Sequence, residues 1–352
     1  MMPPKLVLSA TRDEAPGAGL RVAGLSVVER ALKQLGQATG TAVTVASDGS
    51  LALPASLPAN VQVQSVADRA AADDLARSSG APIVGADVVR LDRASLDGLR
   101  VVDEPSRRAA EDAVYGALFR ADLGFVARHL NKPLSVRFTR HVLVRSPITP
   151  NQITLFAAAL GLAGCALMAT GGYLLVLLGL LLEHTQSVLD GCDGELARVR
   201  FQQSKLGAWL DTFVDDVLNV LITASAGIGL WRAGAGSWAL AVGVGGAAML
   251  VLSNLIIMRD MRRQKATGDL MDMVWWFSGG QKLGASTATQ GKPGIGTFLF
   301  ALGRRDTAIF LWVLFALANQ FVLVLIMAAI IALAWFVASV VQLVVRPAPA
   351  AA

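Results

Sequence analysis

The chain has 352 residues, of which 54% are hydrophobic and 16% are charged, with a formal net charge of +5. Its mean hydropathy of +0.54 is too high for an ordinary soluble protein. This composition excludes a wholly soluble or disordered chain, and the modest charge does not indicate a nucleic-acid partner. Charged residues recur regularly up to about residue 145, whereas nearly all long apolar runs lie in residues 152–346. We therefore expect a soluble N-terminal part followed by an integral membrane domain.

Residues 1–108 alternate between strand-like and helix-like segments, which is typical of a small α/β domain. A stretch rich in Gly, Pro and Ser at residues 48–60 predicts a loop. The first residues lack the apolar core and cleavage site of a signal peptide, so we expect this domain to be cytoplasmic. The predicted strands and helices lie at residues 5–9, 25–35, 42–46, 66–78 and 81–89.

Residues 109–150 are amphipathic and basic, and they directly precede the first long apolar run. This pattern predicts juxtamembrane helices that lie in the membrane interface. The alternative is a linker helix that packs on the soluble domain. The apolar residues at helical spacing are Val114, Leu118, Leu123, Val126 and Leu130, and the basic cluster contains Lys132, Arg137, Arg140, His141 and Arg145.

A helix that crosses a bilayer needs about 20 apolar residues. Six candidate segments predict a membrane domain of six transmembrane helices over residues 151–346, followed by a disordered tail at 347–352. The fifth segment is short and merges with the sixth at Asn319-Gln320. The six predicted spans lie at residues 152–170, 172–192, 206–231, 236–258, 305–319 and 320–345.

Basic residues are concentrated in alternate connections between these spans. The connections at Gly171 and Asn319 carry no Lys or Arg, and the connection near Gly234 carries only Arg232. The positive-inside rule places the basic connections, and with six spans both termini, in the cytoplasm. We expect a protein of the cytoplasmic membrane. The basic residues concerned are Arg198, Arg200, Lys205, Arg259, Arg262, Arg263, Lys265, Lys282, Lys292, Arg304 and Arg305.

Acidic residues inside the second and third predicted spans need an explanation, because charges are costly in a membrane. Asp190 and Asp193 share one helical face with Gly194 and Ala197, at positions i, i+3, i+4 and i+7. Cys192 lies between the two aspartates in sequence but off this face. It and Cys165 fall in or beside apolar runs, so no disulfide framework is predicted.

Gly207, Asp211 and Asp215 lie at positions i, i+4 and i+8, again on one helical face. The connection back to Asp193 is short, so both helices are expected to be neighbours that bring four carboxylates together near the cytoplasmic surface. Such a cluster predicts a hard divalent cation, either Mg²⁺, Mn²⁺ or Ca²⁺. The adjacent Arg198 suits a phosphate group, so the pattern indicates phosphoryl chemistry.

The complete pattern, D-x2-D-G-x2-A-R-x8-G-x3-D-x3-D from Asp190 to Asp215, resembles the signature of the CDP-alcohol phosphotransferases at every fixed position. The pair Pro150-Asn151, followed by Thr154, resembles the start of the first span in that family. The resemblance extends from about residue 112 to 346. It implies six spans and transfer of a phosphoalcohol group, for example a phosphatidyl group, from a CDP-alcohol to an acceptor hydroxyl, with release of CMP. It also implies a homodimer.

By position, the resemblance implies that Asp190, Asp193, Asp211 and Asp215 hold the metal, with Mg²⁺ the expected ion, Mn²⁺ an alternative and Ca²⁺ an occupant or inhibitor. Asp215 is also our expected general base. The residues expected to bind the cytidine diphosphate and its phosphates are Gly194, Ala197, Arg198 and Gly207. The donor is either CDP-diacylglycerol or a small CDP-alcohol such as CDP-inositol, in phospholipid or inositol-phosphate biosynthesis. The acceptor is inositol phosphate, glycerol phosphate, inositol or a lipid hydroxyl.

The N-terminal domain resembles more weakly the nucleotidyltransferase-like domain fused to some family members, through Gly24-Leu25-Ser26 and Glu29-Arg30. The loop after the first strand lacks the Gly-rich, basic character of that fold, so we expect an inactive domain that serves scaffolding, dimerisation or regulation.

Several alternatives stay open. The aspartates could form an ion-paired face of a transporter or receptor, or the motif could persist in a non-catalytic nucleotide-binding or scaffold protein. Glu183 and His184 suit either acceptor binding or packing. The basic groups at 259–263 and 304–305 suit either an acceptor phosphate or membrane anchoring.

Overall fold

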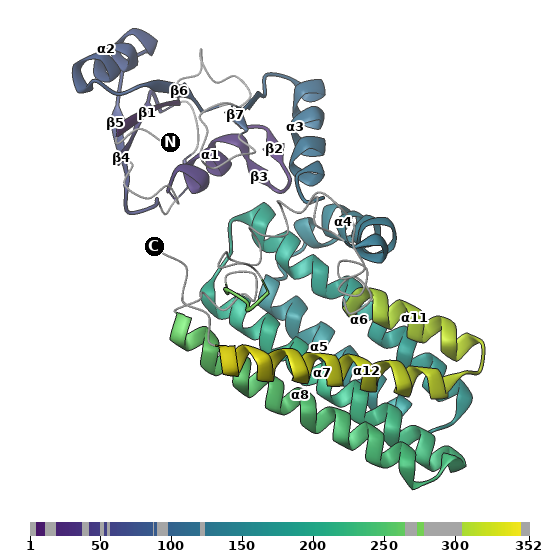
Figure 1. Cartoon of the computed structure of the whole chain (residues 1–352). Helices are drawn as coiled ribbons and strands as arrows, with labels where there is room; N and C mark the ends of the chain where they lie inside the picture. Colours follow the sequence, from purple (N-terminus) through teal and green to yellow (C-terminus); the bar gives the residue numbers. More distant parts are fainter. Residues whose placement is uncertain are drawn as a thin grey trace. The chain divides into compact units, whose positions relative to one another are not determined.

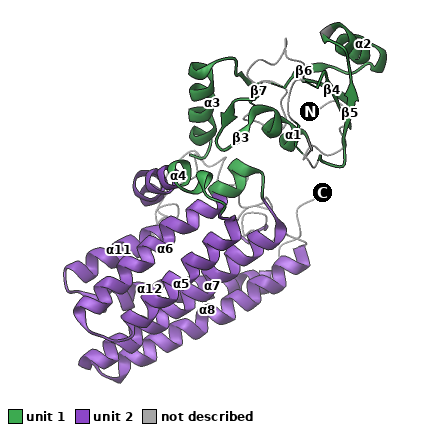
Figure 2. Cartoon of the chain, turned by 180° about the vertical axis from the view of Figure 1, so that it is seen from behind, with its two compact units in different colours: residues 1–119, 139–147, 195–202 green, residues 120–138, 148–194, 203–352 purple. Residues whose placement is uncertain are grey.

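The computed structural model describes residues 5–10, 19–36, 42–49, 53–54, 57–86, 88–89, 98–119, 124–264, 273–277 and 305–345 (Figure 1). The chain divides into two compact units, coloured separately in Figure 2. Unit 1 consists of Met1–Phe119, Thr139–Pro147 and Glu195–Gln202, and unit 2 consists of Arg120–Phe138, Ile148–Gly194 and Gln203–Ala352.

Unit 1 is built on a parallel four-stranded sheet with the order β5-β4-β1-β6. Helices α1 and α2 connect parallel strands, as such pairing requires. Alternate side chains of β1 point to opposite faces: Leu6 and Leu8 pack with α1, and Val7 packs with α2. The predicted α/β region is therefore confirmed. The elements are β1 (Lys5–Ala10), α1 (Val27–Gly36), β4 (Ala42–Ser47), β5 (Val61–Ser65), α2 (Arg69–Ser79) and β6 (Ile83–Gly85).

Two short antiparallel pairs complete this unit: β2 (Arg21–Val22) with β3 (Leu25–Ser26), and β7 (Val88–Val89) with β8 (Leu99–Arg100). The turn between β2 and β3 contains Ala23 and Gly24, both with positive φ, at 49° and 82°. Glycine is favoured in this conformation.

The juxtamembrane segment contains α3 (Glu104–Gly116), a π-helical turn η1 (Ala127–Asn131), α4 (Lys132–His141) and a 3₁₀ turn η2 (Leu143–Arg145). Helix α3 starts at Asp103, whose carboxylate accepts a hydrogen bond from the Ser106 amide at 2.9 Å. Residue 108, the expected domain boundary, falls inside α3, and residues up to Phe119 group with unit 1.

Unit 2 is a bundle of long apolar helices. They are α5 (Pro150–Met168), α6 (Tyr173–Arg200), whose last turns belong to unit 1, α7 (Lys205–Leu230), extended by the π-helical turn η3 (Trp231–Ala235), α8 (Ser237–Gln264), α11 (Arg305–Leu317) and α12 (Phe321–Val345). Five of these helices, in the described part of the chain, are long and apolar enough to cross a membrane.

The described residues do not confirm the sixth expected span, which corresponds to α11. This helix has 13 residues in the described structure, or about 20 Å at 1.5 Å per residue, whereas the hydrocarbon core is about 30 Å thick. The turn that separates α11 from α12 does contain Asn319-Gln320, as predicted, and Asn319 has a φ of 55°. The described residues thus give five spanning helices and one shorter apolar helix.

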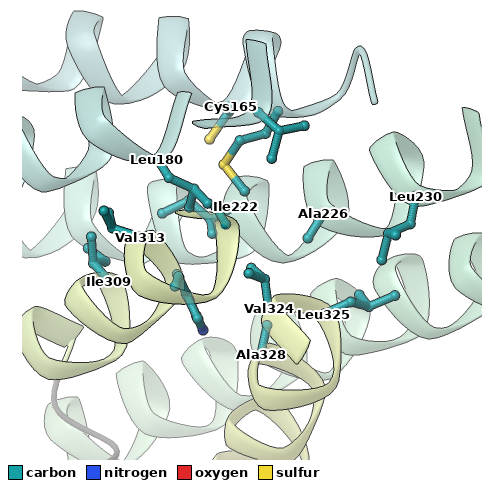
Figure 3. Close-up of a cluster of buried hydrophobic side chains, with 14 of the residues drawn as sticks. Cys165, Leu180, Ile222, Ala226, Leu230, Ile309, Val313, Val324, Leu325 and Ala328 are labelled. Carbon is teal, nitrogen blue, oxygen red and sulfur yellow. The ribbon is translucent and has the colours of Figure 1, made fainter. Parts of the chain in front are cut away.

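A buried apolar cluster holds these helices together (Figure 3). It combines Cys165 of α5, Leu180 of α6, Ile222 of α7, Ile309 of α11 and Leu325 of α12. Many large apolar side chains on the same helices are instead exposed, as in a protein surrounded by lipid. The long apolar helices therefore identify an integral membrane protein.

Some predictions concern residues outside the described part of the structure. They are the periodic Leu123, the basic residues Lys265, Lys282, Lys292 and Arg304, the tail at 347–352 and residues 11–18 after the first strand.

Candidate active site

The first half of the motif lies on one helix, α6. Asp190, Asp193 and Gly194 occupy the part of α6 that belongs to unit 2, and Ala197 and Arg198 follow on the part that belongs to unit 1. Asp193 is 6% exposed, so its carboxyl group is almost wholly removed from solvent. A buried carboxylate needs compensation from hydrogen bonds or a cation.

The second half lies on α7, which starts just after Ser204. The Ser204 hydroxyl accepts a hydrogen bond from the Gly207 amide at 3.0 Å and caps the helix. Asp211 and Asp215 then follow on successive turns. The helix therefore begins so that both carboxylates lie within its first three turns.

The carboxyl groups of both helices meet. Those of Asp190 and Asp211 are in hydrogen-bonding contact. Asp190 also interacts electrostatically with Asp193 and Asp215, and Asp211 interacts with the same two residues. Two carboxylates in contact repel unless a proton or a cation lies between them. The structure thus brings together the four aspartates that the sequence singled out.

Helix α5 contributes two further side chains. The Thr154 hydroxyl, 2% exposed, donates a short hydrogen bond to Oδ2 of Asp193. Near the start of α5, Oδ1 of Asn151 lies 3.0 Å from the position that a Cβ at Gly207 would take. Glycine at position 207 therefore permits the close approach of Asn151, and the two helix starts lie side by side at the site.

Helix α11 contributes a cation, Arg305. Its Nη1 forms an ion pair with Oδ1 of Asp215, and its Nη2 donates a hydrogen bond to Oε1 of Gln186 at 2.8 Å. Arg305 also interacts with Asp190 and Glu183. The partly buried guanidinium of Arg305 thus offsets part of the negative charge of the cluster.

The other polar residues in this part of α6 have different partners. Glu183 is fully buried and accepts a hydrogen bond from Sγ of Cys165 at 3.2 Å. The ring of His184 lies 6.2 Å from that of Phe310. Sγ of Cys192 donates to the Val188 carbonyl at 3.4 Å, off the aspartate face as predicted. For Glu183 and His184, acceptor binding and packing both stay open, since Glu183 also interacts with Arg305.

The basic residues at the end of α8 lie elsewhere in unit 2. Nε of Arg263 donates to Oδ1 of Asp260 at 2.6 Å, and Arg259 lines a cavity of about 240 Å³ with these two residues, Ile256 and Leu343. Arg262 contacts Sδ of Met258 at 3.8 Å.

The residues present fit a divalent cation in their chemistry. The donor set consists of carboxylate oxygens, which Mg²⁺ prefers. The Oδ1 atoms of Asp190 and Asp211 are buried and accept no hydrogen bond. Among the described residues, no group of three or more acidic, His or Cys side chains is arranged as a complete metal site. The orphaned oxygens are the structural feature that a cation would satisfy.

A membrane-embedded carboxylate site on a helical bundle defines the class of protein, and comparison with known sequences defines the family. The family model for CDP-alcohol phosphatidyltransferase matches residues 147–345, which is more than half of the chain. The chain belongs to this family. Members of the family generally use divalent metals.

Curated relatives agree with this assignment. The chain is 36% identical over 145 residues to a bifunctional IPC transferase and DIPP synthase of Rubrobacter xylanophilus, covering 41% of this chain and 32% of the relative. It is 37% identical over 124 residues to the protein of the same name from Thermococcus kodakarensis, covering 34% and 27%. It is 38% identical over 98 residues to the inner membrane protein YnjF of Escherichia coli, covering 27% and 45%. The chain therefore spans less than half the length of each of these relatives.

The sequence pattern identifies the four aspartates, but it does not predict that Arg305, Gln186 and Asn151 lie beside them. Arg305 is 90 positions from Asp215, and no local periodicity links the two. A usable signal existed for Thr154 and Asn151, because both belong to the segment at the first span that resembles the family. For Gln186 the signal was its spacing, one helical turn before Asp190 on the same face.

Proposed function

We propose that this chain is a metal-dependent CDP-alcohol phosphotransferase whose active site is the carboxylate cluster of α6 and α7. The observation that carries the proposal is the meeting of the carboxyl groups of Asp190 and Asp211, with one buried, unpartnered oxygen on each. The alternative of an ion-paired structural face is disfavoured, because the ion pair described at this cluster sets one guanidinium, that of Arg305, against four carboxylates of the described residues.

In the proposed reaction, the acceptor hydroxyl oxygen attacks the phosphorus that carries the donor alcohol. A bond forms between them, the bond from that phosphorus to the oxygen of CMP breaks, and CMP leaves. Asp215 accepts the hydroxyl proton, with Arg305 orienting its carboxylate through the ion pair. Arg198 contacts a phosphate, and the small residues Gly194, Ala197 and Gly207 make room for the cytidine diphosphate.

Asp190, Asp193, Asp211 and Asp215 would hold the cation, with Mg²⁺ the proposed ion. A bound divalent cation would supply charge stabilisation for the phosphoryl oxygens and the leaving CMP. The hydroxyl of Thr154 would orient the carboxylate of Asp193 toward it through the hydrogen bond described above.

We further propose that the site opens to the cytoplasm, that both termini are cytoplasmic and that the enzyme is a homodimer. The distribution of Lys and Arg supports the sidedness, whereas the dimer follows from the family resemblance alone. An interfacial role for α4 is supported by Leu134 and Phe138, which are exposed apolar residues four positions apart, and by the exposed Val142 directly after the helix. The last turn of α4 also serves as a linker, because Arg140 pairs with Asp112 of α3 at 2.7 Å.

The experiment that tests the proposal is CMP release by the purified full-length protein with Mg²⁺. Donors would be CDP-diacylglycerol and CDP-inositol, each offered with inositol phosphate, glycerol phosphate, inositol and a lipid hydroxyl. Wild type is expected to release CMP with at least one pair, and Asp215→Asn to lose about 10²- to 10⁴-fold in rate, as for a general base. Equal release by both proteins would contradict the proposal.

The identity of the acceptor is a separate question, which needs its own experiment. Mass spectrometry of lipids and soluble phosphates from cells with and without the protein would identify the product, and hence the acceptor. A phosphorylated acceptor would give one of the basic groups at 259–263 or 305 a role in binding it.

A further inference from the structure

The end of α6 follows directly on the motif and is held by residues far away in sequence. The last carbonyls of any helix lack partners within that helix. Here Gln202 folds back and donates its amide to the Ala197 carbonyl at 2.8 Å, while Phe201 adopts a φ of 56°. The Val199 carbonyl accepts its hydrogen bond from Arg30, on α1 of the N-terminal domain, at 3.0 Å. All of these residues belong to unit 1.

Arg30 is unusually placed for an arginine. It is 3% exposed and lies on α1 off the face that packs on the sheet, which is formed by Val28, Ala31, Leu32 and Leu35. Its Nη2 also donates to the Val22 carbonyl at 3.1 Å, and its guanidinium lies 5.3 Å from the centre of the Phe201 ring. Burial lowers the pKa of Arg30 to about 10, so it is charged at neutral pH. A cation at a helix C-terminus interacts favourably with the helix dipole.

Other contacts in unit 1 fix the same turns of α6. Nη2 of Arg200 donates to the Leu143 and Ser146 carbonyls at 2.9 and 2.5 Å. The Thr139 hydroxyl donates to Oε2 of Glu195 at 2.8 Å, with both side chains fully buried. Residues 139–147 therefore form a second set of contacts that fixes the end of α6.

The N-terminal domain reaches this segment as well. A Cβ at Gly24 would lie 2.6 Å from Cγ1 of Val144, so glycine permits contact between the β2–β3 turn and η2. Arg30 and Gly24 thus join the N-terminal domain to both the end of α6 and the segment that holds it.

We propose that Arg30 is a positioning residue for the CDP-alcohol reaction. By capping the last turn of α6, it fixes the turn that carries Ala197 and Arg198, and so determines how well the nucleotide binds. The N-terminal domain then acts as a scaffold for this turn of the motif helix. This inference rests on the proposed function, which gives Ala197 and Arg198 their role at the cytidine diphosphate.

The test measures the affinity of the full-length protein for CDP in the presence of Mg²⁺, by calorimetry in detergent, which requires no knowledge of the acceptor. Arg30→Met keeps the length and burial of the side chain but removes its charge, and is expected to weaken CDP binding about tenfold, the scale of one hydrogen bond to a charged group. Arg30→Lys, which restores a cation at the helix end, is expected to recover part of the affinity. Lys33→Ala, on the same helix and paired only locally with Glu29 at 3.3 Å, is the control and should bind as wild type.

A double-mutant cycle distinguishes positioning from general destabilisation. If Arg30 acts through Arg198, then Arg30→Met should weaken CDP binding much less in an Arg198→Met background than in wild type. An undiminished effect in that background, or wild-type affinity in Arg30→Met, would overturn the inference. If Arg30→Met does not fold, Phe201→Leu is the substitute variant, because it removes the ring that the Arg30 guanidinium contacts. Unchanged CDP affinity in Phe201→Leu would equally overturn the inference. A wild-type protein that binds no CDP would instead refute the proposed nucleotide pocket.

Discussion

Thr154 and Asp193 form a buried pair that links α5 to α6. Replacing Thr154 with Val keeps the shape of the side chain but removes the hydroxyl that orients the carboxylate. We predict an about 10- to 100-fold weaker affinity for Mg²⁺, and hence a higher Mg²⁺ requirement, the usual effect of losing such an orienting group. Titration of CMP release with Mg²⁺ measures it. Thr223→Val is the matched control, because Thr223 is 2% exposed and donates only to the Asn219 carbonyl of its own helix, at 2.9 Å. Equal Mg²⁺ requirements in both variants would count against a cation at Asp193.

Arg305 is expected to be essential because of its ion pair with Asp215. In Arg305→Met, Asp215 loses its partner inside the site, and we predict a fall in CMP release of about 10²-fold or more. Steady-state kinetics with saturating donor measures this fall. The control is Arg232→Met, because Arg232 is exposed and donates to the Ala169 carbonyl at 3.1 Å, at the far end of α7 from Asp215. Activity within a few fold of wild type in Arg305→Met would show that Asp215 does not depend on this pair.

Helices α7 and α8 approach each other through two glycines. A Cβ at Gly243 would lie 2.6 Å from Cα and 2.9 Å from N of Gly227, both backbone atoms that cannot move aside easily. Small residues allow such close approach of membrane helices. We predict that Gly243→Ala lowers the thermal unfolding temperature in detergent, at a cost of about 1–3 kcal/mol.

Gly245 on the same helix offers a matched comparison. Apart from its chain neighbours and the backbone of its own helix, no atom of the described residues lies within 4 Å of a Cβ at this position. Gly245→Ala should therefore leave the unfolding temperature unchanged or slightly raised, because alanine favours helix. Equal destabilisation by both variants would mean that the contact between Gly227 and Gly243 does not hold α7 against α8.

The helices were largely predictable because each apolar run is long and bounded by Gly, Asn or charged residues. Predicted and observed boundaries differ where the backbone continues past the apolar stretch. Helix α6 runs to Arg200 rather than residue 192, and α8 to Gln264 rather than 258. Charges end the part of a helix that suits lipid, but they do not end its hydrogen bonding. Side-chain partners across the bundle, such as Arg305, depend on tertiary packing that no local pattern contains.

The orientation of the whole chain in the membrane is a separate prediction. Both native cysteines are buried, so introduced cysteines can be labelled over a low background. In intact cells, we predict that a membrane-impermeant thiol reagent labels Ala235→Cys, in the connection before α8, but labels Gln203→Cys, beside the motif, only after permeabilisation. Gln203 lies at a basic connection and Ala235 at one that carries a single Arg. The opposite labelling pattern would place the active site on the other side of the membrane.

At the level of the full molecule, the chain combines a membrane domain with an N-terminal domain, and within unit 1 that domain contacts the last turns of α6. The sequence predicted both parts, and it predicted which aspartates meet. The sequence did not predict that Arg30 caps α6. No local pattern around Arg30 indicates a hydrogen-bond partner 169 positions away.

The central claim is that the aspartates of α6 and α7 bind one catalytic cation. The most direct test is the Mg²⁺ dependence of CMP release by wild type, Asp211→Asn and Asp216→Asn, with excess chelator as the zero point. Asp216 is adjacent to Asp215 on α7 but off the shared face. We predict that chelator abolishes release by wild type, that Asp211→Asn loses it at every Mg²⁺ concentration, and that Asp216→Asn retains the wild-type Mg²⁺ requirement. Release that persists in chelator, or an Asp211→Asn variant with a wild-type Mg²⁺ curve, would contradict the claim.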